Sequence, residues 1–363
     1  MATLVFEGET KIFLEEFHDY SGPGRKHAGF YNPVLEIDRD LNVLFCRYIA
    51  KKGAKKFLDG LASSGIRGIR IAREVDGDIE MHINDCNPKS YEIIKKNVEI
   101  NGVSAYVYNK HFCSVVQEKK YDYIDIDPYG SPIPFLSCIF KALKKLTYIS
   151  ITATDTATLC GAFDKACIRK YQAIPLKKHS VKEAGLRILI GYMARQAGSF
   201  DYSFKPLIGY SYGHFFRVYA KIEKGARKSN ENIKNVGWVG WKNGWKLFEY
   251  DELDKSFIAG PLWIGKIYDK EVIDEISQIV DKKKLNKKEK LKKMLAHFKE
   301  EESLPPLYYE TRYIAKEIKT AQPKIERLIK KLKNKGYKAG KTHFMSDAFK
   351  TDAPYDEIKR LFG

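Results

Sequence analysis

The chain has 363 residues, 44% of them hydrophobic and 30% charged, so it is too long for a mini-protein and can bury one large core or two smaller ones. No stretch approaches the roughly 18 apolar residues of a membrane span, and acids such as Glu7, Glu15 and Asp19 interrupt the start of the chain, so we expect no secretory signal and a cytosolic, globular protein. The net charge of +18 favours a polyanionic partner such as nucleic acid.

The first half of the chain predicts a parallel sheet covered by helices. Short β-branched or apolar runs alternate there with amphipathic stretches, which is typical of α/β domains. Five runs are expected to form strands: residues 55–58, 79–84, 105–109, 121–126 and 147–151. Two further runs, 207–212 and 214–222, meet at Gly213 and resemble an antiparallel edge hairpin, which brings the sheet to about seven strands.

The composition changes near residue 224 and predicts a domain boundary. Residues 224–243 are rich in Gly, Asn, Lys and Ser, which is typical of a linker or of a hairpin that begins a second unit. We therefore expect a first domain over 1–224, with an N-terminal extension, and a smaller α+β domain over 225–363. Residues 281–299 predict a strongly basic helix, which either faces solvent or contacts an RNA backbone.

The last part of the chain predicts two helices and a strand. Residues 313–320 and 324–335 have helical patterns separated by Gln322 and Pro323, and residues 337–344 follow as a strand or wing. This order resembles a winged-helix segment. Plain packing of a helix pair is the alternative, whereas four basic residues favour contact with nucleic acid: Arg327, Lys330, Lys331 and Lys338.

The six cysteines lie at positions 46, 86, 113, 138, 160 and 167. No pair has the C-x-x-C spacing, and no Cys/His cluster has the spacing of zinc ligands. We therefore expect scattered reduced thiols, with Cys160 and Cys167 in structural roles. A redox or catalytic thiol is the alternative.

Two predicted strand ends carry an acid followed by a turn. Asp59 precedes a loop of small residues that runs to Gly68, where backbone N–H groups can approach a ligand. Asp85 lies where nucleoside-binding α/β folds accept hydrogen bonds from ribose hydroxyls. Each signal has a structural alternative: the loop lacks the glycine spacing of a dinucleotide fingerprint, and Asp85 could cap the helix that begins at Pro88.

The run from Tyr123 to Pro132 contains the most informative strand end. A buried strand ends in Asp127-Pro128-Tyr129-Gly130, at the edge where open α/β sheets bind ligands. An exocyclic amine of a nucleobase is a poor nucleophile because its lone pair is delocalised into the ring, and a carboxylate that accepts its N–H improves it. Asp127 suits that role, and Tyr129 offers a face on which a base can stack. An Asp-Pro turn beside a core tyrosine is the alternative.

Six motifs in this order resemble the Trm1 family of tRNA guanine N2-dimethyltransferases, and the likeness runs from about residue 29 to about residue 355. The family has the class I methyltransferase fold, which implies a Rossmann-like, seven-stranded, mostly parallel sheet. The motifs are Phe30-Tyr31-Asn32-Pro33, Arg39-Asp40-Leu41, the stretch 65–70, Asp127-Pro128-Tyr129-Gly130-Ser131-Pro132, Thr152-Ala153-Thr154-Asp155 and Leu159-Cys160-Gly161-Ala162.

The resemblance implies S-adenosyl-L-methionine as the cofactor. Arg39 and Arg67 would hold it through its methionyl carboxylate, and Asp85 would accept its ribose hydroxyls. Asp59, at the glycine turn, belongs to the same expected site. His111 and Phe112 stand where the family has an Asp-Ala pair that meets the adenine. A neutral imidazole and the Phe112 backbone N–H can still make such contacts.

The resemblance also implies a catalytic site. Asp127, followed by Pro128, would receive the N–H of the guanine amine, and Phe30 with Tyr129 would enclose the flipped base. Some relatives carry a paired-cysteine zinc site in the region of residues 238–259, which holds no cysteine here, so we expect no metal. The implied activity transfers one or two methyl groups to N2 of guanine 26 of tRNA, at the junction of the D arm and the anticodon stem.

Two other functions remain open at this point. One is a non-catalytic RNA-binding protein, which the charge and the tail favour. The other is an amino-methyltransferase of adenine or cytosine in DNA, although those enzymes typically have two prolines before the tyrosine and here Pro128 is followed directly by Tyr129. The sequence does not decide the oligomeric state, and a monomer is favoured.

Overall fold

The computed structural model describes residues 3–15, 28–252 and 257–362. They form two compact units, each built from segments that are distant in the sequence. The first contains the described residues within 1–154, 219–224 and 271–295, and the second those within 155–218, 225–270 and 296–363. The domain boundary expected at residue 224, between a first domain over 1–224 and a smaller α+β domain over 225–363, stays a prediction. No helix within the described ranges is long and apolar enough to cross a membrane.

A seven-stranded sheet forms the framework, with the strand order β5-β4-β3-β6-β7-β9-β8. The strands are β3 Lys56–Asp59, β4 Glu80–Asn84, β5 Tyr106–Tyr108, β6 Tyr123–Ile126, β7 Leu146–Ala153, β8 Tyr202–Tyr212 and β9 Phe215–Lys224. The neighbours from β5 to β7 pair in parallel. A connection of two residues, as between β8 and β9, joins antiparallel strands. The expected strands and the mostly parallel Rossmann-like sheet are confirmed.

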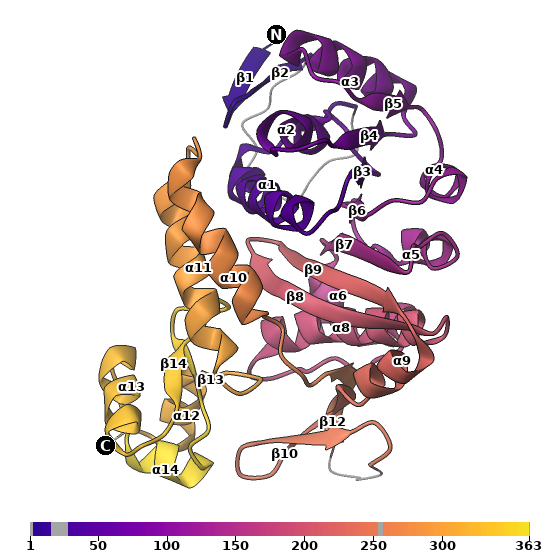
Figure 1. Cartoon of the computed structure of the whole chain (residues 1–363). Coiled ribbons are helices and arrows are strands. Elements are labelled where there is room, and N and C mark those ends of the chain that lie inside the picture. The colour runs from indigo at the N-terminus through magenta and orange to yellow at the C-terminus, as the bar shows by residue number, and fades with distance from the viewer. Residues whose placement is uncertain (1–2, 16–27, 253–256, 363) are drawn as a thin grey trace. The chain divides into compact units, whose positions relative to one another are not determined.

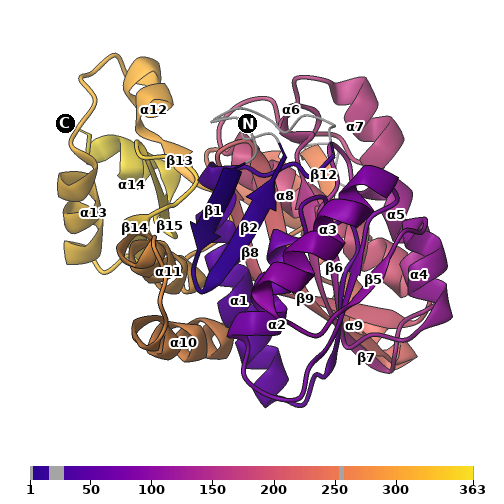
Figure 2. The same cartoon turned by 90° about the horizontal axis from the view of Figure 1, so that it is seen from above.

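Helices alternate with the parallel strands and cover both faces of their sheet (Figures 1 and 2). They are α1 Glu36–Lys51, α2 Ile66–Glu74, α3 Pro88–Asn101, α4 Phe112–Glu118 and α5 Ile133–Ile139. The Asn87 side chain caps α3 by accepting from the Lys89 backbone N–H, and Gly102, at φ +58°, ends the helix. The alternative in which Asp85 caps this helix is therefore wrong.

The N-terminal extension is a hairpin of β1 Thr3–Glu7 and β2 Thr10–Leu14 that packs on α2 and α3. Two asparagine side chains of α3 form hydrogen bonds with the backbone at the edge of β2, as a neighbouring strand would. Asn97 accepts from the Phe13 N–H at 2.7 Å, and Asn101 accepts from the Lys11 N–H at 3.0 Å. Their amide groups donate back to the carbonyls of the same two residues. These bonds pair the part-buried N–H and carbonyl groups along this edge of β2.

The hairpin also carries Glu7 into the first unit, where it is buried between two arginines. Its carboxylate accepts from Arg39 Nε and Nη2 at 2.7 and 2.6 Å, from Arg70 Nη1 at 2.8 Å and from the Tyr31 hydroxyl at 2.9 Å. Burial alone would raise the pKa of Glu7, but the attraction and hydrogen bonds of Arg39 and Arg70 outweigh it and lower the pKa to about 2. Glu7 is thus a buried anion stabilised by paired cations.

A disulfide joins Cys113 of α4 to Cys138 of α5, so the expectation of reduced thiols is wrong for this pair. The two residues lie 25 positions apart, and the packing of α4 on α5 brings their Cα atoms to 5.5 Å. Cys46, Cys86, Cys160 and Cys167 form no disulfide with the described residues. Burial raises the pKa of Cys160 to about 11 and that of Cys167 to about 12, which disfavours a reactive thiolate and supports structural roles.

The second unit contains two small three-stranded sheets, ordered β11-β10-β12 and β13-β15-β14. The strands are β10 Val236–Trp241, β11 Trp245–Glu249, β12 Phe257–Trp263, β13 Tyr309–Glu310, β14 Ala339–Lys341 and β15 Ala348–Thr351. Its first helices are α6 Thr156–Leu159, α7 Asp164–Tyr171, α8 Val181–Gly198 and α9 Ala226–Ile233. Residues 224–243 therefore form α9 and the start of the β10–β11 hairpin, which agrees with the hairpin interpretation rather than with a linker.

The C-terminal part contains α12 Thr311–Glu317, α13 Ile325–Asn334 and α14 Tyr355–Arg360 around a shared apolar core. The core includes Leu328 and Leu332 of α13 with Phe349 of β15. The expected helix pair is present, whereas the expected strand over 337–344 is only the three residues of β14. The helix pair followed by β14 and β15 matches the winged-helix-like segment expected from the sequence.

The expected basic helix over 281–299 is wrong in its first part. Helix α10 Lys270–Ile279 is followed by a 3-10 turn, η2 Val280–Lys282, and helix α11 Lys288–Glu302 begins only later. Lys283 between them has extended backbone. Leu285 is buried, and Asn286 donates to Glu36 of α1 at 2.7 Å. These tertiary contacts override the local helical pattern.

The burial of Glu7 between Arg39 and Arg70 predicts that the free energy of unfolding falls in acid. Replacing Glu7 by Gln removes the charge that compensates Arg39 and Arg70, and we expect a loss of about 3 kcal/mol in the free energy of unfolding near pH 7. Because the pKa of Glu7 is lower in the folded state than in the unfolded chain, its contribution is present above about pH 4.5 and is lost as the pH falls towards about 2.

Chemical denaturation of both proteins at several pH values measures this contribution. The other charged groups around Glu7 are the same in both proteins and cancel in the difference; they are Arg39, Asp40, Arg70 and Glu74. The gap in unfolding free energy should narrow on acidification. A gap that widens at low pH would contradict the assignment.

Candidate active site

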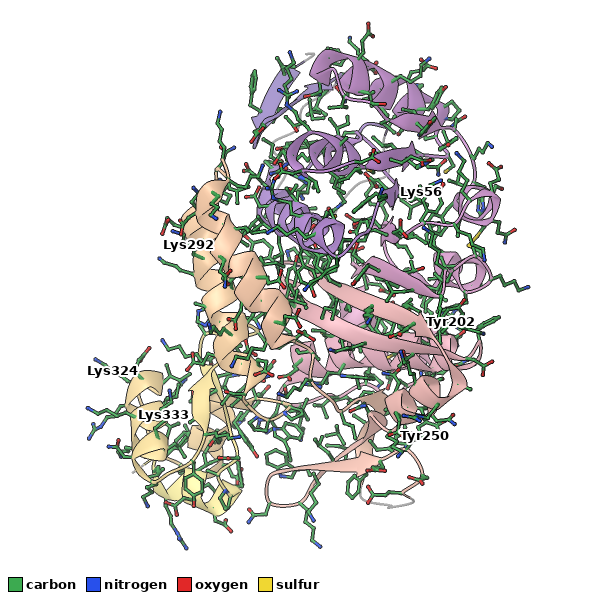
Figure 3. All side chains as sticks on the ribbon, in the orientation of Figure 1. Lys56, Tyr202, Tyr250, Lys292, Lys324 and Lys333 are labelled. Carbon is green, nitrogen blue, oxygen red and sulfur yellow. A yellow bond between two sulfur atoms is a disulfide. The ribbon has the colours of Figure 1, made fainter. Side chains whose placement is uncertain are left out.

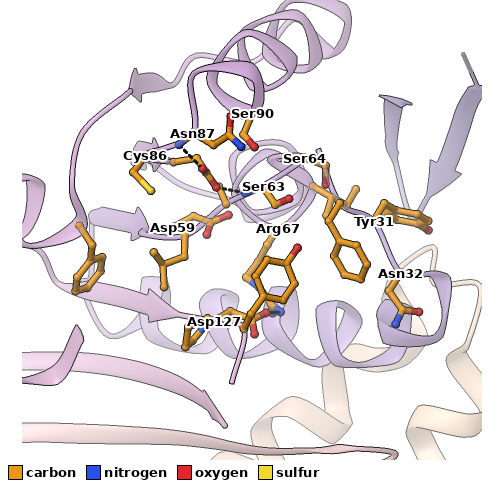
Figure 4. Close-up of a pocket in the computed structure, with 18 of the residues that line it drawn as sticks. Tyr31, Asn32, Asp59, Ser63, Ser64, Arg67, Cys86, Asn87, Ser90 and Asp127 are labelled. Carbon is orange, nitrogen blue, oxygen red and sulfur yellow. Dashed lines mark hydrogen bonds and ion pairs between the residues drawn. The ribbon is translucent and has the colours of Figure 1, made fainter. Parts of the chain in front are cut away.

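The carboxyl ends of β3, β4 and β6 meet at one edge of the sheet, where a cavity of about 530 Å³ opens within the first unit (Figure 4). The three loops that follow these strands line it, together with residues around 30–39 and the start of α4. The volume lies in the range of sites for small molecules and cofactors. The position agrees with the rule that open α/β sheets bind ligands beyond the carboxyl ends of their strands.

The loop after β3 brings backbone close to the cavity. Asp59 is buried, and its carboxylate accepts from the Gly68 N–H of α2 at 2.9 Å, which fixes the turn between strand and helix. A Cβ at Gly60 would lie 2.4 Å from the Phe112 ring, so only glycine fits there. Burial, with repulsion from Asp125, raises the pKa of Asp59.

The loop after β4 presents Asp85. Its carboxylate accepts from the backbone N–H groups of Ser63 and Asn87, both at 2.8 Å, as the dashed lines in Figure 4 show. Asp85 thereby connects the first and second loops. Burial raises the pKa of its carboxyl despite these two hydrogen bonds. A carboxylate held by backbone at a cavity wall can accept hydrogen bonds from a diol.

The loop after β6 presents Asp127, whose Oδ2 lies 2.7 Å from Nη2 of Arg67. The same Nη2 donates to Asp38 of α1 at 2.7 Å, and Nε lies 3.6 Å from Asp125. Asp127 is 27% exposed and faces the cavity, whereas Asp38 and Asp125 are buried. Arg67 binds Oδ2 of Asp127, and among the described residues Oδ1 of Asp127 accepts no side-chain hydrogen bond. This oxygen is available to a ligand.

Two aromatic rings border the cavity beside Asp127. Phe30 and Tyr129 meet edge to face, with ring centroids 5.5 Å apart and an interplanar angle of 75°. Tyr129 is 37% exposed. Gly130, at φ +82°, makes the turn that follows, and its N–H donates to Thr154 Oγ1 at 2.6 Å. The turn holds the tyrosine at the mouth of the site, while enclosure of a base by the two rings stays a prediction.

Arg39 lines the cavity, and its guanidinium binds Glu7 of the N-terminal hairpin. Its Nε and Nη2 bind the Glu7 carboxylate, and Nη2 also donates to the Asn32 carbonyl at 3.0 Å. Its guanidinium lies 4.9 Å from the Tyr31 ring centroid. The N-terminal hairpin therefore orients this arginine, and its contact with a cofactor carboxylate stays a prediction.

His111 and Phe112 start α4 at the far wall of the cavity. His111 is the N-cap residue and is exposed, whereas Phe112 is 2% exposed and packs edge to face on Phe135. Both residues line the cavity, and their contact with the adenine of the cofactor stays a prediction. No hydrogen bond of the imidazole is formed within the described part of the chain.

The structure brings every expected site residue to this one cavity. These residues are Phe30, Arg39, Asp59, Arg67, Asp85, His111, Phe112, Asp127, Pro128 and Tyr129. The roles given to them individually stay predictions. Sequence reasoning missed Glu7 and Asp38, which bind the two arginines, because nothing local to either acid reveals its partner. Among the described residues, no group of three or more His, Cys, Asp or Glu side chains is arranged to hold a metal ion.

Comparison with known proteins places the chain among tRNA-modifying enzymes. The model of the family described as N2,N2-dimethylguanosine tRNA methyltransferase matches residues 8–362. The tRNA (guanine(26)-N(2))-dimethyltransferases of Pyrococcus abyssi and Pyrococcus furiosus are 34% and 36% identical to it, and each match covers 97% of this chain and 96% of the relative. The structure of Trm1 from Pyrococcus horikoshii with S-adenosyl-L-methionine is 30% identical, with a TM-score of 0.89 and 99% of both chains covered.

The sequence match and the structural match both extend over nearly the whole chain, including the second unit. The chain belongs to the N2,N2-dimethylguanosine tRNA methyltransferase family.

Proposed function

We propose that this protein transfers one or two methyl groups from S-adenosyl-L-methionine to the exocyclic N2 of guanine 26 in tRNA, at the junction of the D arm and the anticodon stem. The observation that carries the proposal is the placement of Asp127, which shares one cavity with Asp85 and with the glycine turn after β3. We also infer that the enzyme acts in the cytosol and as a monomer. A monomer can form the site without a partner subunit, because all residues that line the cavity come from one chain.

The first unit supplies groups that fit the cofactor. Its cavity combines a close-packed glycine turn, a carboxylate held by two backbone N–H groups and two arginines. Asp85 would accept the ribose hydroxyls, and Arg39 and Arg67 would hold the methionyl carboxylate. When bound, the cofactor supplies a methyl group that its sulfonium has already activated, so the protein has mainly to align the acceptor and exclude water.

Asp127 would orient and activate the guanine amine. Arg67 occupies Oδ2, so the amine N–H would be accepted by Oδ1. This hydrogen bond directs the nitrogen lone pair away from Asp127 and, as the N–C bond forms, gives the departing proton an acceptor. Arg67, fixed by buried Asp38, would prevent Asp127 from turning away. A second transfer would need the methylated amine to rotate and present its remaining hydrogen to the same oxygen.

The acceptor role makes Asp127 the most sensitive position. Asp127→Ala and Asp127→Asn should each lower kcat for methyl transfer to tRNA roughly 100-fold or more, because a positioned proton acceptor contributes about that much. Cofactor affinity, measured by calorimetry, should change much less. Mass analysis of nucleosides from treated tRNA gives the readout and separates one methyl group from two.

Asp78→Asn is the matched control, because the Asp78 side chain is 93% exposed and its one ion pair among the described residues is with Lys55 at 3.7 Å. It should leave kcat unchanged. Full activity of Asp127→Ala would support the non-catalytic interpretation, and unmodified guanosine after treatment with the unaltered protein would refute the proposed function itself.

Asp85 should act on cofactor binding. Asp85→Ala removes a charged hydrogen-bond acceptor worth about 1.5–3 kcal/mol, so the Kd for S-adenosyl-L-methionine should rise roughly 10- to 100-fold. Asp85→Asn keeps acceptor geometry and should give a smaller rise. Calorimetry needs no tRNA for this test. An unchanged Kd in both variants would remove Asp85 from the cofactor site.

Tyr129 should act on the base through its ring. Tyr129→Phe keeps the stacking face and should keep most activity, whereas Tyr129→Ala should raise KM for tRNA by roughly 5- to 100-fold, the equivalent of about 1–3 kcal/mol of stacking. Cofactor binding should stay the same in both variants. If the two variants lose activity equally, the hydroxyl rather than the ring is what matters.

A further inference from the structure

The segment from α12 to α13 carries an excess of positive charge that the protein does not neutralise. Residues 311–335 contain nine Lys or Arg side chains and only two acids, Glu317 and Glu326. Five of these cations are exposed and form no side-chain hydrogen bond or ion pair with any residue in the described ranges: Lys316, Lys319, Lys324, Arg327 and Lys330. No ion pair with a described residue offsets the positive charge of these five side chains, so they contribute to a positive potential at this surface.

The two acids of this segment are already engaged by other partners in the second unit. Glu317 accepts from the Tyr355 hydroxyl at 2.6 Å and lies 3.7 Å from Lys359. Glu326 pairs with Lys341. Glu326 also attracts Lys324 electrostatically, but among the described residues neither acid forms an ion pair with any of the five exposed cations, so the surface keeps a net positive charge.

Helix α13 sets several of these cations on one face. Leu328, Ile329 and Leu332 bury the opposite face in the C-terminal core. At 100° per residue, Arg327 and Lys330 point directly away from that core, and Lys324 stands at the start of the same stripe. Figure 3 shows Lys324 on the outer side of the molecule at the start of α13. The helix thus presents cations to solvent along its length.

The lysines of residues 281–293 differ in part, because three of them form ion pairs inside the first unit. Lys283 lies 4.0 Å from Glu9 and 3.9 Å from Asp76, and Lys287 lies 3.9 Å from Glu36. Lys292 lies 2.5 Å from Asp281. A run of lysines that appears equally basic in the sequence is thus partly engaged in internal ion pairs, whereas the five exposed cations of α12 and α13 form none with the described residues.

A nucleic-acid stem is the partner that this chemistry fits. The helix pair has the order of a helix-turn-helix, but the major groove of A-form RNA is deep and too narrow for side chains to read. Flexible Lys and Arg side chains on a convex helix instead suit phosphate oxygens, which they contact without regard to base sequence. An acidic protein would also be attracted, but the family's substrate is itself a polyanion with regularly spaced charges.

We infer that the exposed face of α13, with the end of α12, is a contact surface for the phosphate backbone of a tRNA stem. The surface comprises Lys316, Lys319, Lys324, Arg327 and Lys330 and shares no residue with the cofactor cavity. It rests on the proposed function for the identity of the RNA. It supplies affinity rather than chemistry, and it does not select a sequence.

The test is a full-length triple variant, Lys324→Gln with Arg327→Gln and Lys330→Gln. Binding of a labelled tRNA transcript is measured by fluorescence anisotropy over a range of salt concentrations. Each lost phosphate contact should lower the slope of log K against log salt by about 0.7–0.9, so the slope should fall by about 2–3 and the affinity near 0.1 M salt by roughly tenfold or more. Cofactor Kd and Tm should not change, because all three side chains are exposed.

The matched control removes the same formal charge from ion-paired positions of the second unit, as Lys333→Gln with Lys335→Gln and Lys359→Gln. It should retain the salt slope of the unaltered protein. An equal loss in both variants would show that net charge alone matters, and no loss in either would favour an acidic protein as the partner; both results overturn the inference.

Binding and methyl transfer are read separately, which distinguishes the two proposals. If the unaltered protein binds tRNA with a salt slope that the triple variant lacks but transfers no methyl group, the surface stands and the proposed function fails. If the unaltered protein methylates tRNA and the triple variant keeps its KM and Kd for tRNA, the function stands and the surface fails.

Discussion

The guanidinium of Arg67 lies among the acids that crowd the carboxyl edge of the sheet. It donates to Asp38 and Asp127 at 2.7 Å each and lies 3.6 Å from Asp125. Without this cation, carboxylates from α1, β6 and the loop after β6 would repel one another in a poorly solvated site. The catalytic geometry proposed for Asp127 therefore depends on a pairing that spans three elements.

A second layer of charge supports the first. Glu7 comes from the N-terminal hairpin and binds Arg39 and Arg70, and Arg70 also lies 2.8 Å from Asp40 and 2.9 Å from Glu74. The buried ions thus form a connected set rather than isolated pairs, as low dielectric requires. The hairpin, which contributes no strand to the seven-stranded sheet, orients Arg39 at the wall of the proposed cofactor cavity.

Residues 281–293 and helix α13 are both rich in lysine, but their charges have different surroundings in the structure. Around residues 281–293, Lys283, Lys287 and Lys292 pair with acids of the first unit, and the chain at Lys283 is extended rather than helical. On α13 the apolar stripe fits the C-terminal core, so the opposite face keeps its cations unneutralised in solvent. The proposed division between a catalytic unit and an RNA-contacting unit rests on the exposed cations of α13, which form no ion pair with the described residues.

By itself, the sequence determined the strands, the α/β order and the acids at the ends of β3, β4 and β6, because hydrophobic periodicity and turn residues act over short distances. Parallel strands bring such ends to one edge, so the cavity lining was also predictable. Only the tertiary structure decided that Glu7 binds Arg39, that Asp38 shares Arg67, that Cys113 pairs with Cys138 and that residues 283–287 leave the helix. Each of these depends on which distant surfaces pack together, and no local pattern carries that information.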